Sequence, residues 1–379
     1  MTSSEARAEN THSGSNHYTL YGMELSLYTG KVRSYLRYKQ IPFDEVLATR
    51  DIYKSVILPN VGKAIVPVVA TPDGQYVQDS SDIIDFLEQR VPARPVYPSS
   101  PKQRLAALLL EQMADEWLII PAMHYRWNFP DYNQAYLEKE FGAGSKPELD
   151  EAGQRAQGRH TGSLFKGSVP MLGATPEMFP AIESWYEQLL DQLNSHFSRH
   201  RFLLGDAPTL ADFGFIGPLY AHLGRDPYPM LQMQSRAPHV YQWVSRMRLL
   251  DELSFGPLLP EDTISPEIEA ILGRMFKEQF PVLQDLANQL DHWATDNPDT
   301  AIPRAIGMHT FRIGDSEGER MLSPFNQWMV QRPLDYYHQL NGSARANTEA
   351  WLADIGGEDA MNMVIKRPLI RVNNNLQFA

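Results

Sequence analysis

The hydrophobic pattern at the start of the chain switches from strand-like to helix-like spacing. Residues 18–21 form a short, aromatic, β-prone run, and after Gly22 the apolar positions of residues 32–36 recur at helical spacing. Pro42 ends that helix because the residue before a proline disfavours the helical conformation. Residues 43–47 then predict a second strand, so the first unit of the chain is a strand, a helix and a strand.

A hairpin and a second helix are expected next. Residues 66–70 and 75–77 are strand-like and flank the turn Pro72-Asp73-Gly74. Ser80 or Ser81 is expected to cap a helix whose apolar residues end at Leu87. The predicted order is therefore βαβ followed by ββα.

The rest of the first 250 residues predicts mainly helices. Residues 90–98 contain three prolines and predict an extended linker. Ser100-Pro101 is a typical helix start and opens a long apolar stretch to about Trp127. Residues 142–176 are rich in Gly and Ser with little periodicity, which predicts a mobile loop, and helical spacing returns at residues 179–197.

One local motif in this helical region has a clear structural meaning. Thr209 is followed three residues later by Asp212, which is the form of a capping box that opens an apolar helix. Caps contribute about 1 kcal/mol each to stability and need no chemical function. We therefore expect both residues to be structural.

The last 120 residues predict a further set of elements. Apolar positions between Ile268 and Trp293 mark an amphipathic helix, and residues 308–322 predict a two-stranded hairpin. Ser323-Pro324 and Ser343 open two final helices, and the run of asparagines at 373–375 is expected to break the tail. Within the hairpin, His309 and Arg312 are expected as a surface pair.

Length and these breaks predict the domain organisation. A chain of 379 residues is long enough for two or three folding units. We expect a disordered tail at 1–17, an α/β domain at 18–90 and a helical domain at 100–257. Residues 258–379 are then a helical extension with a short hairpin, packed on the helical domain.

Composition narrows the possible functions. The formal net charge of -12 disfavours nucleic-acid and anionic-membrane partners, so none is expected. The chain has no cysteine, which excludes disulfides, thiolate metal sites and a cysteine nucleophile, and no metal site is expected. No apolar run reaches about 18 residues, and the start has no apolar signal segment. A cytoplasmic location is expected.

Four motifs resemble one family. The run from Leu20 to Arg33, with Ser26, Tyr28 and Lys31-Val-Arg33, is similar to the first strand and helix of serine-type glutathione S-transferases. Val66-Pro67-Val68 resembles the family's Val-Pro element, residues 78–83 resemble its Glu-Ser-x-Ala-Ile helix start, and residues 209–213 resemble its second-domain cap. The resemblance implies a thioredoxin-like N-terminal domain followed by a helical C-terminal domain.

The resemblance also implies a catalytic residue, Ser26. Glutathione carries a thiol that an enzyme must hold as a thiolate near neutral pH. Ser26 lies where the first helix is expected to begin, so its hydroxyl can donate to the sulfur while the helix end supplies positive potential. The structural alternative is a plain helix cap. Tyr21 is the rival thiolate donor, with a core strand aromatic as its own alternative.

Glutathione itself is the implied co-substrate, held by four residues. The resemblance implies a cis Val66-Pro67 bond that exposes the Val66 backbone to the cysteinyl unit; an ordinary edge-strand proline is the alternative. It also implies that Asp79 binds the γ-glutamyl amino group and that Ser80 binds the carboxylate at a helix start. A plain helix cap is the alternative for both.

The second substrate is expected to be a small hydrophobic electrophile. Tyr28 is expected to line its pocket, together with residues on the long helix after the linker, although a core role is the alternative for each. The helix residues are Met113, Trp117 and His124.

Two functions remain open from the sequence. One is a glutathione-dependent transferase that attacks an electrophile, cleaves an ether or removes a halide. The other is a non-catalytic binding or scaffold protein with the same fold, which Leu27 and Gly30 slightly favour because proline and a basic residue are common at their places in the family. A homodimer is implied by the resemblance alone.

Overall fold

The computed structural model describes residues 17–379, and the expected tail therefore lies, apart from His17, outside the described residues. A four-stranded sheet forms first, in the order β2-β1-β3-β4. Its strands are β1 (Tyr18–Gly22), β2 (Phe43–Leu47), β3 (Val68–Ala70) and β4 (Tyr76–Gln78). β1 is parallel to β2 and antiparallel to β3, and β4 is antiparallel to β3. The predicted βαβ and ββα order is confirmed.

The strand directions decide where the helices begin. β1 and β4 are both antiparallel to β3 and so run in the same direction. Helix α1 (Leu27–Tyr38) follows β1, and helix α4 (Ser80–Arg90) follows β4. Both helices therefore begin at the same edge of the sheet, and their N-termini meet there.

Successive side chains of a strand point to opposite faces of the sheet, and each face carries its own apolar layer. Leu20 and Val69 are fully buried in the main core with α1 and α4. Val68 packs on the opposite face, in a small cluster with Ile57 and Val61. That second face is covered by α2 (Arg50–Ile52), η1 (Tyr53–Ile57) and α3 (Leu58–Val61). The fold class of this part, a thioredoxin-like mixed sheet with helices, is as expected.

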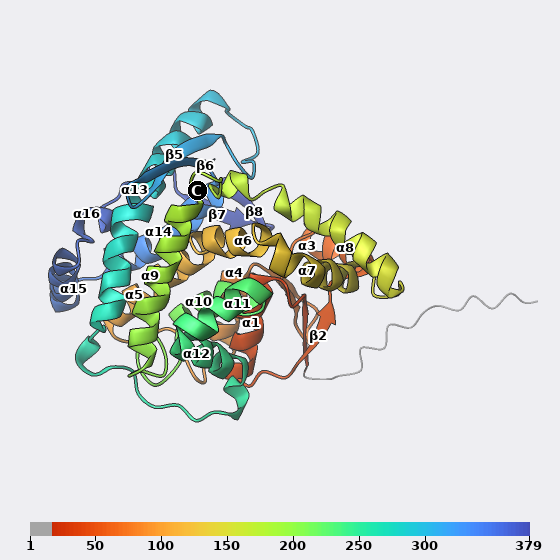
Figure 1. The fold of residues 1–379 in the computed structure, drawn as a ribbon. Helices are drawn as coiled ribbons and strands as arrows, with labels where there is room; N and C mark the ends of the chain where they lie inside the picture. Colours follow the sequence, from red (N-terminus) through yellow and green to blue (C-terminus); the bar gives the residue numbers. More distant parts are fainter. Residues whose placement is uncertain (1–16) are drawn as a thin grey trace, which may run out of the picture.

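A helical domain follows the proline-rich linker. Its central helix, α10 (Leu210–Ala221), is buried along its whole length and packs on α5 (Pro101–Glu116) and α1 (Figure 1). Its helices are α5 (Pro101–Glu116), α6 (Ile119–Trp127), α7 (Pro130–Ser145), α8 (Glu151–Lys166), α9 (Phe179–Phe197), α10 (Leu210–Ala221), α11 (Pro227–Arg236) and α12 (Pro238–Arg248).

The long helix predicted to run from Ser100 to Trp127 is two helices. Pro121 has no backbone N–H and so cannot bond to the Trp117 carbonyl, which accepts from Ile120 instead at 3.0 Å. The chain turns at Trp117 and Leu118, and α6 begins at Ile119 with Pro121 in its first turn. The apolar pattern continues through the break because both helices are buried.

Residues 142–176, which were predicted to include a mobile loop, are mostly helical. The region contains the end of α7, all of α8 and a short 3-10 helix, and α7 packs closely along α8. A Cβ at Gly142 would lie 1.9 Å from the Gln154 carbonyl oxygen, and one at Gly158 would lie 1.8 Å from the Glu138 carbonyl oxygen. These glycines let two helix backbones approach each other.

The capping box is present as predicted. Thr209 caps α10, and the Asp212 carboxylate accepts from the Thr209 backbone N–H at 2.9 Å. The same carboxylate accepts from the Leu203 backbone N–H at 2.9 Å and from the Trp243 indole at 3.1 Å. Asp212 therefore also ties the start of α10 to the preceding loop and to α12.

The extension contains more structure than expected. The predicted hairpin is β5 (Met308–Ile313) with β6 (Ser316–Met321), and the predicted helices are α13 (Pro266–Asp296), α14 (Pro324–Gln339) and α15 (Gly342–Asp354). A short α16 (Glu358–Met361) and a second hairpin, β7 (Leu369–Val372) with β8 (Asn375–Phe378), were not expected. Asn373 and Asn374, at φ of 49° and 61°, form its turn, so the asparagines reverse the chain.

The extension contacts the helical domain through its long helices. α13 packs on α9 and α5, and α14 packs on α5 (Figure 1). His196 of α9 bonds to Ser265, the residue that caps α13, at 2.8 Å. Among the described residues, no helix is long and apolar enough to cross a membrane.

Candidate active site

The candidate site lies at the sheet edge where α1 and α4 begin. Tyr21, Val68 and Gln78 pair across the sheet in one row. One residue further toward the edge, Gly22 ends β1, Pro67 precedes β3 and Asp79 follows β4. The topology thus gathers the β1–α1 loop, the Val66-Pro67 bond and the Asp79-Ser80 pair. The Val66-Pro67 bond is cis, as predicted, and Val66 is half-buried.

Ser26 lies at the N-cap of α1 and is half-buried. Its Oγ accepts from the Thr29 backbone N–H at 3.2 Å, so the cap interpretation is realised. Within residues 17–379 its hydroxyl donates to no protein group, which leaves the proton available to a ligand. The loop before it is tight, because a Cβ at Gly22 would lie 2.2 Å from the Thr29 side chain.

Asp79 is the N-cap of α4, in place of the expected Ser80 or Ser81. Its backbone has a positive φ of 87°, and Oδ1 accepts from the Ser81 backbone N–H at 2.9 Å. Ser80 is the first helical residue and is buried at 3% exposure. Its hydroxyl makes no hydrogen bond to another residue of the described part of the chain. A hydroxyl without a protein partner at a helix start is suited to binding an anion.

The two tyrosines of the first motif occupy different surroundings. Tyr21 stacks on Tyr76 at 6.4 Å, on the face of the sheet covered by α3, and burial raises its pKa. The Tyr28 hydroxyl donates to the backbone oxygen of Asp115 at 3.0 Å. Burial, and then the charge of Glu116, raises the pKa of Tyr28 well above its usual range. Tyr28 is therefore a neutral donor that already has an acceptor.

The expected pocket residues on the helices are all buried. Met113 lies in the core. Trp117 packs edge-on against Phe311, with 6.0 Å between the ring centres. Asp115, two residues before Trp117, accepts a hydrogen bond from Tyr28 through its backbone oxygen, so Trp117 and Tyr28 lie in one region. His124 instead bonds to Glu183 of α9 at 2.9 Å, and burial lowers its pKa. None of these contacts brings His124 to Ser26.

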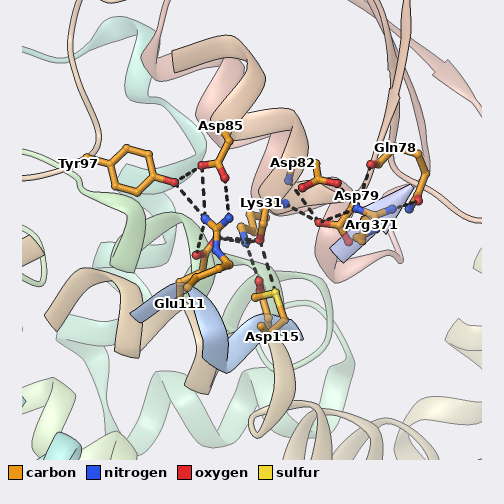
Figure 2. Close-up of polar contacts among 12 residues, drawn as sticks. Lys31, Gln78, Asp79, Asp82, Asp85, Tyr97, Glu111, Asp115 and Arg371 are labelled. Atoms are coloured by element: carbon orange, nitrogen blue, oxygen red, sulfur yellow. Dashed lines mark hydrogen bonds and ion pairs between the residues drawn. The ribbon is translucent and has the colours of Figure 1, made fainter. Parts of the chain in front are cut away.

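A buried ion network joins the two domains beneath the site (Figure 2). Lys31 of α1 is fully buried, and its Nζ lies 2.6 Å from Glu111, 2.6 Å from Asp115 and 3.0 Å from Ser81. Burial alone would lower the pKa of Lys31, but the charges of Asp115 and Glu111 outweigh it and raise that pKa. Lys31 thus links α1 and α4 to α5, a role that its place in the first motif did not indicate.

The extension adds two arginines to the acidic side chains of α4. Arg332 of α14 lies 2.5 Å from Asp85 of α4 and 3.3 Å from Glu111 of α5. Arg371 of β7 donates to the Gln78 side-chain oxygen at 2.7 Å and pairs with Asp82 (Figure 2). Burial raises the pKa of Asp82 to about 6, although Arg371 acts in the opposite direction.

Arg371 also lies 3.9 Å from Oδ1 of Asp79, the residue expected to bind the glutathione amino group. The sequence analysis missed both arginines because their partners are more than 200 positions away. Among the described residues, no group of three His, Asp or Glu side chains is placed to hold a metal ion.

The fold and this sheet edge define a two-domain class of protein, with a thioredoxin-like domain followed by a helical domain. Residues 20–95 match the family model of the glutathione S-transferase N-terminal domain, and residues 172–251 match that of the C-terminal domain. The chain therefore contains regions that match both domains of the glutathione S-transferase family.

Solved structures with limited similarity include several transferases. A glutathione S-transferase from Rhodospirillum rubrum F11 is 21% identical, covering 66% of this chain and 94% of its own, with a TM-score of 0.40. The β-etherase LigF from Sphingobium sp. strain SYK-6 is 17% identical, covering 62% and 97%, with a TM-score of 0.44. A Methylobacterium radiotolerans transferase in complex with glutathione sulfonate is 20% identical, covering 65% and 100%, with a TM-score of 0.37. No curated protein matched the chain.

Proposed function

We propose that this protein is a glutathione-dependent transferase whose glutathione lies at the edge where α1 and α4 begin. The observation that carries the proposal is the hydroxyl of Ser80, a buried residue at the start of α4, because this hydroxyl has no hydrogen-bond partner in residues 17–379. A glutathione carboxylate there gains that hydroxyl, the backbone N–H groups of the first turn and the positive end of the helix. Asp79, at the preceding position, supplies a carboxylate for the amino group.

Ser26 supplies the chemistry in this proposal. Its Oγ accepts from the Thr29 N–H, so the hydroxyl proton points elsewhere and can be donated to the glutathione sulfur. Such a donor favours the thiolate, which attacks an apolar or aromatic electrophile. The S–C bond forms, the leaving group departs with its electron pair, and the thiol proton passes to solvent. Ether cleavage and dehalogenation by glutathione begin with a similar attack.

One observation favours a second candidate, a binding protein without turnover. Arg371 lies 3.9 Å from the Asp79 oxygen that the glutathione amino group would need, and it belongs to the hairpin that ends the extension. A cation at that place competes with the amino group for the same carboxylate. If the hairpin blocks the site, Arg371→Met raises glutathione affinity, whereas the transferase proposal requires the wild-type protein to bind glutathione unaided.

Calorimetry and kinetics with serine variants test the proposal. Ser26→Ala should lower kcat with an aromatic halide by about 10-fold to 1000-fold and raise the pKa of bound glutathione, while its Kd changes little. Asp79→Asn keeps a capping oxygen but removes the charge, and should weaken glutathione binding by about 1.5 to 3 kcal/mol. Ser80→Ala should do the same more mildly.

Ser245→Ala is the matched control, because Ser245 is exposed on α12 and bonds only to the Tyr241 carbonyl. It should change neither kcat nor the Kd for glutathione. If the wild-type protein does not bind glutathione, the transferase proposal is wrong. If Tyr21→Phe changes the thiolate pKa and Ser26→Ala does not, Tyr21 is the thiolate donor.

Three further expectations belong to this proposal. We expect a homodimer, with a cytoplasmic location, and light scattering tests the dimer directly. We also propose that residues 258–379 form one extension docked on the helical domain, as the contacts of α13 and α14 support.

A further inference from the structure

Arg320 of β6 is a buried cation without an ionic partner. It is 3% exposed, and its Nε is enclosed with no hydrogen-bond partner. Within residues 17–379 its guanidinium forms neither an ion pair nor a hydrogen bond, and it lies over the Trp117 ring, 5.2 Å from the ring centre. Burying an unpaired cation costs several kcal/mol. Such a cost calls for an explanation that the folded chain alone does not supply.

The acidic group whose charge acts on Arg320 is Glu116. It lies at the end of α5 and is buried, and within residues 17–379 no ion pair joins it to Arg320. Burial, and then the charge of Asp115, raises the pKa of Glu116 well above its usual range, which disfavours the charged carboxylate that Arg320 would need as a partner. Burial lowers the pKa of Arg320 to about 10, and the guanidinium therefore stays charged.

Arg320 is linked to the region of Tyr28 through the end of α5. Its neighbour Trp117 ends the same helix turn as Asp115, whose carbonyl accepts from Tyr28, and Tyr28 is two residues after Ser26. The exposed Arg304, on the coil between α13 and β5, adds a second positive charge that acts on Tyr28. Two cations of the extension thus act on the region between α1 and α5.

We propose that Arg320 binds the carboxylate of the second substrate, whose aromatic or apolar body packs against Trp117. This inference rests on the proposed transferase function and narrows it to anionic electrophiles. A buried arginine is well suited to this task because its planar fork can donate two hydrogen bonds to one carboxylate. The glutathione sulfur then attacks the electrophilic carbon of the same substrate, the leaving group departs with its electron pair, and the thiol proton passes to solvent.

Two matched electrophiles test the assignment. In 4-chloro-3,5-dinitrobenzoate and its methyl ester the same carbon is attacked and chloride leaves, but only the first carries a carboxylate. We expect the wild-type kcat/KM, divided by each compound's uncatalysed rate constant with glutathione, to be larger for the acid. Arg320→Met should lower this acid-to-ester ratio by about 10-fold to 100-fold, mainly through KM, as for loss of a hydrogen bond to a charged group. Arg320→Lys should restore part of it.

Arg312→Met is the control, because Arg312 is an exposed arginine of the same hairpin that pairs with Glu317. It should leave the ratio unchanged. Glutathione binding by calorimetry separates the possible failures. If Arg320→Met weakens glutathione binding and slows both electrophiles equally, Arg320 holds glutathione and the inference is wrong. An unchanged ratio with a folded variant also overturns it, and a wild-type protein that neither binds glutathione nor turns over the ester overturns the proposed function instead.

Discussion

Lys31 and Arg320 are two buried cations in opposite situations. Lys31, at the interface of α1 and α5, has two carboxylates at 2.6 Å and a hydroxyl at 3.0 Å. Arg320, on the hairpin of the extension, has an aromatic ring at 5.2 Å and no ion pair within the described part of the chain. Burial acts in the same direction on both, yet the pKa of Lys31 is raised and that of Arg320 is lowered to about 10.

This difference separates a structural charge from one available to a ligand. A cation whose partners are all supplied by the protein keeps elements together, because removing it strands its partners in the interior. A cation whose partners are missing lowers the stability of the folded state and retains its capacity to bind an anion. The same criterion distinguishes the Ser81 hydroxyl, which bonds to Glu111 at 2.8 Å, from the Ser80 hydroxyl.

The largest expected effect is on stability. Lys31→Met should destabilise the protein by about 3 to 5 kcal/mol, because the buried Asp115 would lose its cation and Glu111 would keep only Arg332. Arg320→Met should instead raise stability, because it removes the cost of burying an unpaired cation and leaves no bonded partner behind. Urea unfolding at pH 7 measures both. Equal losses in the two variants would contradict the comparison.

A third buried basic residue, His196, extends the comparison to pH. It bonds to Ser265 and to the Phe202 carbonyl, and burial lowers its pKa to about 4, against about 6.5 in the unfolded chain. The unfolded chain therefore binds more protons between these values, so this contribution is complete above about pH 6.5 and is lost as the pH falls toward 4.

The His196 contribution should amount to about 2 kcal/mol between pH 7 and pH 5. The measurement is the difference between wild type and His196→Gln in urea unfolding at the two pH values, which cancels the carboxyl groups common to both. A wild-type pH dependence no steeper than that of the variant would show that His196 is charged in the folded state.

The smallest effect is expected on the outer face of the β5–β6 hairpin. Arg312 and Glu317 pair at 2.7 Å, but both side chains are largely exposed. Exposed pairs contribute between about 0 and 1 kcal/mol, so Arg312→Met should shift the unfolding free energy by no more than that. A larger loss would show that the hairpin depends on this exposed pair for its stability and not only on the side chains of its buried face.

The pattern of the sequence determined the local elements well. Strands 18–22 and 43–47, the helix at 179–197 and the capping box of Thr209 and Asp212 all follow from contacts between residues close in sequence. The order of these elements places Ser26, Val66-Pro67 and Asp79-Ser80 at one sheet edge, so the position of the candidate site was predictable. Their roles toward glutathione stay predictions.

Other features were decided only by the tertiary structure, since they depend on partners distant in sequence. The glycines at 142 and 158 read as loop residues until α7 and α8 pack closely together. His309 and Arg312, expected as a surface pair, are three residues apart in a strand and so point to opposite faces. His309 faces inward opposite Arg320, and Arg312 faces solvent.

The surroundings of the two buried cations, Lys31 and Arg320, were also decided only by the tertiary structure. Composition gives every lysine and arginine a charge, but only the packing of α5 and the extension leaves Lys31 with two carboxylates and Arg320 with none. Local pattern specifies which element a residue belongs to. Burial and the choice of ionic partner are set by which surfaces meet, because the electrostatic energy of a charge depends on the groups around it and not on its neighbours in sequence.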